Sequence, residues 1–199
     1  MKRFWWLAIL ALVSLASAEV LFSEDFFDGN LEGWTREPGE IGLRWVISSQ
    51  RYYNGPYGAI CPKGNNQDER LISPAVCLTA EVSIKFYWAT SYTWFVSPHN
   101  NGDFRLEIRE AGGPGGWVEL WNEEADGPFE NWVWNETEID IGPYWYGHDV
   151  QFAWRVIAHK AADVWLDTIT VYSEDEEPEP DPDLDIEEVS FGRIKAAYL

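Results

Sequence analysis

Apolar and polar residues alternate along three long segments of this chain. In residues 82–88 the apolar side chains fall at every second position, from Val82 to Trp88. Residues 104–109 and 150–156 alternate in the same way. A period of two is typical of an antiparallel strand that buries one face and shows the other to solvent. The three segments therefore predict half-buried strands, with Trp88 and Trp154 in the core.

Shorter segments that are rich in strand-forming residues lie between and around these three. They are residues 20–22, 44–48, 57–61, 69–73, 118–122, 133–141 and 165–172. Turn residues separate the strands at 54–56, 101–103, 112–116 and 141–143. After position 18 we find no long segment with the period of a helix. Many short strands with turns between them predict an all-β fold, an antiparallel β-sandwich of the jelly-roll kind.

The first 18 residues have the three parts of a secretory signal peptide. Lys2 and Arg3 are positive, residues 4–16 are almost all apolar, and residues 16–18 form a small-x-small cleavage site. The apolar run is shorter than the roughly 20 residues that span a bilayer, which favours a cleaved signal over a membrane anchor. We therefore expect a secreted or cell-surface protein that begins near Glu19 and does not span a membrane.

Charge divides the rest of the chain. Without Lys2 and Arg3, the 14 basic residues become 12 against 34 acidic ones, a formal charge of −22. Such a chain repels nucleic acid and suits cations, neutral sugars or basic proteins. Residues 174–188 are acidic and proline-rich, which is typical of a solvated linker. We predict one domain over 19–173, a linker over 174–188 and a short segment over 189–199.

The C-terminal segment differs from the linker before it. Residues 189–199 regain apolar side chains and positive charge, at Arg193 and Lys195. Phe191-Gly192 followed by Ile194-Lys195 resembles the endings of some exported bacterial proteins, which implies a sorting or docking tag. A disordered tail is the alternative.

Two cysteines, Cys61 and Cys77, occur in the chain. An even number of cysteines in an exported protein favours a disulfide, which would stabilise the fold by about 3 kcal/mol. Two free buried thiols are the alternative.

Tryptophan is unusually frequent, with 13 residues in the chain. A sandwich core takes many of them. Trp132 and Trp134, however, share the strand parity of Glu136. Trp145 falls in a predicted turn and Trp94 in a predicted loop. Exposed aromatic side chains mark binding surfaces, and flat indole faces stack on sugar rings. We predict a ligand surface of Trp132, Trp134 and Trp145, with contacts to loops or to a neighbouring domain as the alternative.

Several motifs, in order, resemble the choice-of-anchor J or cleaved-adhesin type of jelly-roll domain, which is related in architecture to MAM domains. They are residues 21–26 with Gly33-Trp34, 68–76, 103–108 with 116–120, 147–155 and 165–171. The resemblance implies a bacterial surface or secreted protein that is adhesive or carbohydrate-associated, often with structural calcium. Three features depart from the family pattern: the cysteine pair, the insertion at 94–100 and the tryptophan content. The resemblance therefore does not identify the ligand.

The resemblance points to Glu24 and Asp167 as calcium ligands, with Asp25 as the next choice. Calcium takes carboxylate and carbonyl oxygens, and the first and last strands of a jelly roll are often neighbours. The alternative is that these are solvated carboxylates, or that Asp167 accepts hydrogen bonds from a neighbouring backbone.

Catalytic signals are weak in this sequence. Its three histidines lack metal-ligand spacing, and it has no nucleophile elbow and no phosphate-binding loop. Glu107 and Glu119 fall on facing strands and have the residue type of a glycosidase pair, but both alternate with apolar positions. We predict a non-catalytic adhesion or carbohydrate-binding module for a carbohydrate or cell-surface protein ligand. A glycan hydrolase and a structural surface protein are the alternatives.

Overall fold

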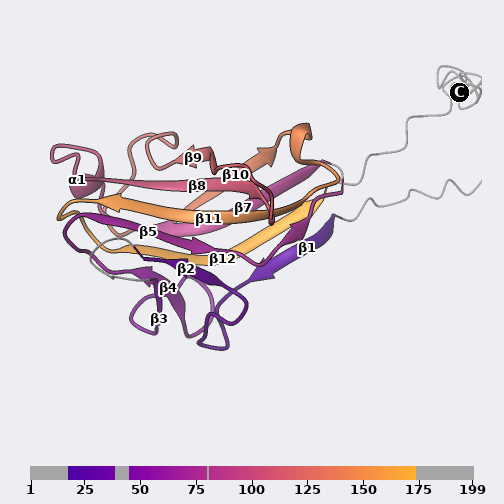
Figure 1. The fold of residues 1–199 in the computed structure, drawn as a ribbon. Coiled ribbons are helices and arrows are strands. Elements are labelled where there is room, and N and C mark those ends of the chain that lie inside the picture. Colours follow the sequence, from indigo (N-terminus) through magenta and orange to yellow (C-terminus); the bar gives the residue numbers. More distant parts are fainter. Residues whose placement is uncertain (1–17, 39–44, 80, 174–199) are drawn as a thin grey trace, which may run out of the picture.

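The computed structural model describes residues 18–38, 45–79 and 81–173. The predicted linker and C-terminal segment lie outside these residues, as does all of the predicted signal peptide except Ala18. Two antiparallel sheets pack face to face in the part of the chain that is described (Figure 1). The predicted antiparallel β-sandwich is therefore confirmed.

The first sheet has the strand order β10-β7-β12-β4-β3, with β1 paired to β12 beside β4. Its strands are β1 (Glu19–Glu24), β3 (Val46–Ser48), β4 (Gly58–Cys61), β7 (Val82–Ala89), β10 (Asn135–Ile141) and β12 (Val164–Ser173). The second sheet has the order β2-β5-β11-β8-β9, with β6 paired to β11. Its strands are β2 (Thr35–Glu37), β5 (Gln67–Ile72), β6 (Val76–Cys77), β8 (Gly102–Glu110), β9 (Val118–Asn122) and β11 (Asp149–Ala158).

The core lies between the two sheets and is aromatic. Phe86 and Trp88 of β7 face Trp154 of β11, and all three are fully buried. The ring centroids of Phe86 and Trp154 are 5.7 Å apart at 82°, an edge-to-face contact of the kind that adds to the free energy of area burial. The alternation along β7 and β11 thus predicted the buried faces correctly.

Differences from the predicted strands are small. β10 begins at Asn135 and not at Val133, because the chain turns at residues 131–132, where Trp132 has a left-handed backbone with a φ of +65°, before regular pairing with β7 starts. β2 and β6 are three and two residues long, too short for alternation to reveal them.

The expected disulfide is wrong: Cys61 and Cys77 are both free. Cys61 Sγ lies 3.7 Å from Nε2 of Gln67, which opposes Ala158 at one end of β11, whereas Cys77 opposes Asp149 at the other end. Because a strand residue advances roughly 3.3 Å, the two thiols are separated by about 30 Å along the sandwich. A disulfide needs Cα atoms within about 7 Å.

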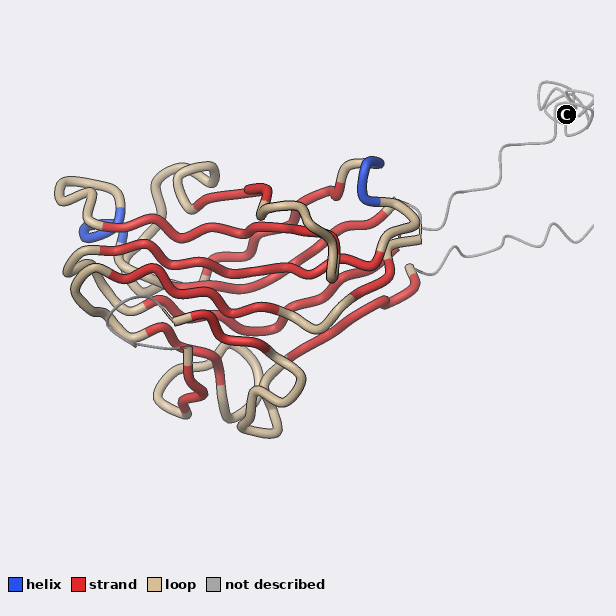
Figure 2. Tube along the Cα trace, viewed as in Figure 1, coloured by secondary structure: helices blue, strands red, loops and turns tan. Residues whose placement is uncertain are grey.

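The long strands run along the sandwich, so the loops gather at its two ends. The short helix α1 (Tyr92–Phe95) lies at the end where β11 finishes, which we call the α1 end. The 3₁₀ turn η1 (Pro143–Trp145) precedes β11 and marks the opposite end, the η1 end (Figure 2).

Candidate ligand-binding site

Four loops enclose a pocket at the α1 end. The pocket has a volume of about 500 Å³. Its walls come from the β4–β5 loop, the β7–β8 loop that carries helix α1, the β9–β10 loop and the β11–β12 loop. The lining residues are Lys63, Gly64, Asn65, Trp94, Trp132, Lys160, Ala161, Ala162 and Asp163.

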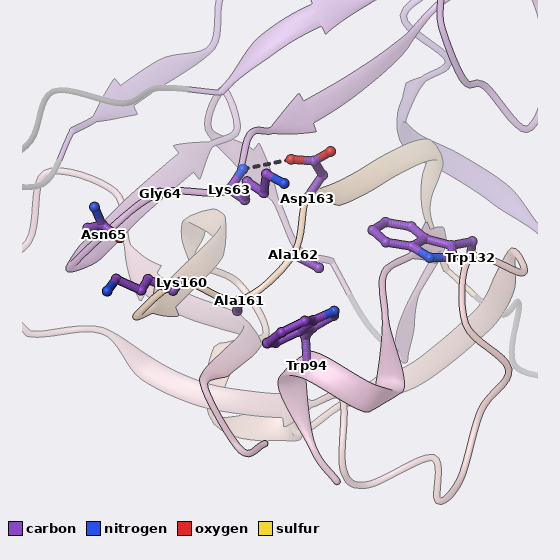
Figure 3. A pocket seen from close by; sticks show the side chains of 9 residues that line it. All are labelled: Lys63, Gly64, Asn65, Trp94, Trp132, Lys160, Ala161, Ala162 and Asp163. Carbon is purple, nitrogen blue, oxygen red and sulfur yellow. Dashed lines mark hydrogen bonds between the residues drawn. The ribbon is translucent and has the colours of Figure 1, made fainter. Parts of the chain in front are cut away.

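Two indoles form one side of this pocket. Figure 3 shows Trp94 and Trp132 on the side opposite Asn65 and Lys160. Trp94 is 41% exposed and Trp132 is 39% exposed, so both rings present an open face beside the cavity. The Trp94 ring also stacks on His99 with 4.2 Å between centroids and 16° between planes, so His99 covers one face of the ring. Half-exposed, supported aromatic rings are the features that bind flat apolar surfaces of a ligand.

Hydrogen bonds hold the two indoles in place. The backbone N–H of Trp132 donates to the carbonyl of Thr90 over 2.8 Å, which secures its left-handed backbone. Asn131 then ties the β9–β10 loop to helix α1. Its Oδ1 accepts from Oγ of Ser91 at 2.9 Å and from the backbone N of Thr93 at 3.0 Å, and its Nδ2 donates to Oγ1 of Thr93 at 3.0 Å. Trp94 and Trp132 therefore sit on loops that are fixed to each other.

The floor of the pocket is small and apolar, and its opposite wall is polar. Ala161 and Ala162 are buried, and their small side chains occupy little of the pocket volume. Oδ1 of Asp163 accepts the backbone N–H of Lys63 at 2.7 Å, the dashed line in Figure 3. The backbone N–H of Lys160 donates to the carbonyl of Gly64 at 2.9 Å, which joins the two loops. Lys63, Asn65, Lys160 and Asp163 thus bring ammonium, amide and carboxylate groups to the rest of the lining.

A second, polar hollow of about 570 Å³ lies next to this pocket at the same end. Four residues with amide side chains line it: Asn66, Gln67, Asn100 and Asn101. His159, which also lines it, is 2.7 Å from Oδ1 of Asn66 through Nδ1. Amides both donate and accept hydrogen bonds, as ligand hydroxyl groups require.

The three predicted ligand residues do not form one surface. Trp132 lines the pocket at the α1 end. Trp134 lies on the outer face of the first sheet against Ile60 and Trp165. Trp145 belongs to η1 at the opposite end. Trp94 was not included in the predicted surface, although the sequence placed it in a loop; its pairing with Trp132 depends on contacts across 38 residues that no local pattern reveals.

The predicted calcium ligands lie near one another but do not converge. Glu24 opposes Ile169 in the β1–β12 pairing, two residues after Asp167. Glu24 and Asp25 line a hollow of about 270 Å³ beside Asn54 and Thr168. No three acidic, histidine or cysteine side chains gather into a metal-holding group in the described part of the chain.

Asp167 serves as a loop anchor, the alternative that the sequence left open. Its carboxylate is buried and accepts backbone N–H groups of Tyr53 at 2.6 Å and Asn54 at 3.2 Å through Oδ2, and of Thr168 at 2.6 Å through Oδ1. Burial raises the pKa of Asp167, and the three backbone donors oppose that shift. The calcium prediction therefore rests on Glu24 and Asp25, which line the hollow. Glu24 also accepts the backbone N–H of Phe26 at 2.7 Å through Oε1 and the indole N–H of Trp34 at 2.9 Å through Oε2.

Glu107 and Glu119 oppose each other on β8 and β9, as the sequence predicted, on the outer face of the second sheet. Glu107 is buried between two arginines, with Oε2 2.8 Å from Arg70 Nε and Oε1 3.0 Å from Arg155 Nη1. Glu119 is 2.9 Å from Arg105. Neither lines the pocket at the α1 end, where Asp163 is the only acidic lining residue among those that the structure describes.

The described residues include no helix long and apolar enough to cross a membrane. No family model matches the sequence, and no curated protein matches it.

Solved structures do match this chain. The K1 cleaved adhesin domain of Lys-gingipain from Porphyromonas gingivalis W83 matches with a TM-score of 0.60 at 15% identity, over 77% of this chain and 98% of that domain. The xylan-binding CBM22-1 domain from Paenibacillus barcinonensis matches with a TM-score of 0.53 at 14% identity, over 81% and 99%. TmCBM61, solved in complex with β-1,4-galactotriose, matches with a TM-score of 0.53 at 15% identity, over 75% and 94%.

At such identities the likeness concerns the fold. This chain has the jelly-roll fold that cleaved adhesin domains share with carbohydrate-binding modules. The predicted cleaved-adhesin type of jelly roll is therefore confirmed as a fold.

Proposed function

We propose that this protein is an exported, non-catalytic module that binds a neutral saccharide in the pocket at the α1 end. The observation that carries the proposal is the pair of half-exposed indoles of Trp94 and Trp132, fixed beside a cavity with polar groups on its far wall. The fold is one that adhesin and carbohydrate-binding domains use, and the signal-peptide pattern supports export.

The chemistry of the pocket suits a sugar ring. An indole face packs against the C–H groups of a pyranose, while Asn65, Lys160 and Asp163 line the same pocket and carry groups that exchange hydrogen bonds with hydroxyl groups. The strongly acidic composition disfavours polyanionic ligands, because the net field of the protein repels them.

Structural calcium is part of the proposal. The hollow beside Glu24 and Asp25 is also lined by Ser23, Asn54 and Thr168, so it is bordered by oxygen-bearing side chains of the kind that calcium takes. An ion there would join the first strand to the last strand and to the loop that carries Asn54. Its role would be stability, since it lies away from the two indoles.

Binding to a glycan array tests the saccharide proposal. The chain from Glu19 onward should bind saturably to neutral glycans. Trp132→Ala and Trp94→Ala should each weaken binding about tenfold or more, equal to about 1.4 kcal/mol, because each removes a stacking surface. Tyr52→Ala is the matched control, since Tyr52 is a similarly exposed aromatic residue that does not line the pocket. Binding that is unchanged in both tryptophan variants would refute this site.

A further inference from the structure

A second aromatic hollow lies at the η1 end of the sandwich. It has a volume of about 470 Å³. It lies between the β8–β9 hairpin and η1, far from the four loops of the first pocket. Its lining residues are Glu110, Gly115, Gly116, Val118, Tyr144 and Trp145.

The aromatic side of this hollow is open to solvent. Tyr144 is 80% exposed, the highest value among the exposed large hydrophobic residues of the described chain. Its ring stands perpendicular to the half-buried ring of Trp145, with 5.0 Å between centroids. Trp145 packs against the core, so it supports Tyr144 from below. The two rings make a corner with an apolar face on each side.

Backbone hydrogen bonds fix the turn that carries these rings. The N–H of Gly147 donates to the carbonyl of Leu78 at 2.6 Å, and the N–H of Leu78 donates to the carbonyl of His148 at 3.0 Å. Pro143 opens η1, and the N–H of Trp145 donates to the carbonyl of Gly142 at 3.1 Å. An exposed corner that is already rigid loses little entropy on binding.

The opposite wall of the hollow has space and a polar group. A Cβ atom added at Gly115 or Gly116 would meet no atom within 4 Å, and neither glycine has a left-handed backbone. The exposed carboxylate of Glu110 lies 3.6 Å from Nδ1 of His148 and keeps accepting capacity for a hydroxyl group. Aromatic faces with a carboxylate beside them are the same combination that the first pocket offers.

We propose that the hollow at the η1 end is a second saccharide site and that one copy of the domain binds two glycan chains at once. The ligand class rests on the function proposed above. β11 runs between the sites, from Asp149 after η1 to Ala158 before the β11–β12 loop. Its ten residues separate the sites by about 30 Å, since a strand residue advances roughly 3.3 Å. A trisaccharide is too short to occupy both.

Binding stoichiometry tests the second site directly. Isothermal titration would use four neutral probes: β-1,4-galactotriose, xylotriose, cellotriose and mannotriose. We expect two sites per chain with at least one probe. Tyr144→Ala should reduce the number to one, and so should Trp132→Ala. Gly116→Phe should do the same as Tyr144→Ala by filling the hollow, without removing any existing contact. Thermal unfolding of each variant would verify the fold.

Cross-linking gives a second readout. The unmodified chain should precipitate a soluble polysaccharide that contains the sugar chain of whichever trisaccharide binds, whereas Tyr144→Ala, Gly116→Phe and Trp132→Ala should bind it without precipitation. Tyr52→Ala should behave as the unmodified chain does.

The outcomes separate this inference from the proposed function. One site per chain that is lost in Trp132→Ala and unchanged in Tyr144→Ala and Gly116→Phe would overturn the second site and leave the first. One site with the reverse pattern would overturn both the first pocket and bivalent binding. Binding of none of the four probes would overturn the inference together with its ligand class.

Discussion

Asn131 shows how far the candidate site depends on a single amide side chain. It makes three hydrogen bonds to Ser91 and Thr93, and it directly precedes Trp132. Ser91 is buried beside the pocket. The amide therefore positions one indole relative to the other without facing the ligand itself.

We expect Asn131→Ala to weaken saccharide binding about as much as Trp132→Ala does, because the β9–β10 loop loses its tie to helix α1. The free energy of unfolding should fall by about 1–2 kcal/mol, since three partly exposed hydrogen bonds are lost. Titration calorimetry and urea unfolding measure the two effects. Asn30→Ala is the control, because Asn30 also bonds locally in an exposed loop but lies elsewhere. Unchanged affinity in Asn131→Ala would show that the hydrogen bonds of Asn131 are not needed to position the two indoles.

Glu123 gives a prediction about pH. Its Oε2 accepts the backbone N–H of Phe104 at 2.7 Å, while Oε1 is buried with no hydrogen-bond partner among the residues that the structure describes. Burial raises the pKa of Glu123 to about 7, and the backbone hydrogen bond from Phe104 only partly opposes this. The raised pKa stabilises the folded protein fully at a pH below 4.5, the ordinary pKa of this carboxyl group. In that range the group is protonated in both the folded and the unfolded protein.

This contribution is lost as the pH rises through about 7. The free energy of unfolding should therefore fall between pH 5 and pH 8 by on the order of 1–3 kcal/mol more in the unmodified chain than in Glu123→Gln, which keeps an acceptor for Phe104. Urea unfolding across this pH range measures the difference. Parallel pH profiles for the two proteins would contradict the assignment.

Single residues also mark where sequence reasoning succeeds. Strand parity placed Trp88 and Trp154 in the core, because alternation along one strand is local information. The same parity predicted Trp134 on the outer face of its sheet, but not the contacts with Ile60 and Trp165 that half-bury it there. Burial by a neighbouring strand depends on strand order, which parity does not contain.

At the scale of elements, β4 and β6 explain the two cysteines. Cys61 is buried in β4 and Cys77 is exposed in β6, and the strands place them at opposite ends of β11. Burial raises the pKa of the Cys61 thiol, and the nearby charges of Glu69 and Asp163 raise it further. Only Cys77 is therefore accessible to reagent in the folded protein.

Thiol titration checks this assignment. We expect one reactive thiol per folded chain and two after unfolding in denaturant, in protein handled without reductant. Cys77→Ser should abolish the reaction of the folded chain, and Cys61→Ser should leave it intact. If the unfolded protein had no free thiol, Cys61 and Cys77 would form a disulfide after all.

The junction of β1 and β12 is where calcium would act. If calcium binds beside Glu24 and Asp25, the melting temperature should rise with millimolar calcium and fall with chelator, because an ion that binds only the folded state stabilises it. Asp25→Asn should reduce the calcium effect, whereas Asp28→Asn, which changes a nearby carboxylate outside the hollow, should preserve it. Equal melting temperatures in calcium and chelator would remove calcium from the proposal.

On the scale of the whole molecule, the sequence predicted the sandwich better than it predicted the site. Alternation defines which faces are buried, and that suffices for two packed sheets. The pocket at the α1 end is built from four loops that lie far apart in the chain, between Lys63 and Asp163. These loops become neighbours only because β7, β12 and β4 adjoin in one sheet and β5, β11 and β8 in the other.

The central position of β12 has a mechanical consequence. β12 runs from Val164, beside the pocket at the α1 end, to Ser173 at the other end, with β7 on one side and β4 and β1 on the other. Tension between a ligand held at the α1 end and the chain beyond Ser173 would pull along this strand. Its hydrogen bonds lie across that direction and would be loaded together, in shear, rather than opened one after another. If the protein binds its ligand at the α1 end and is attached through the chain beyond Ser173, β12 would carry the force between them.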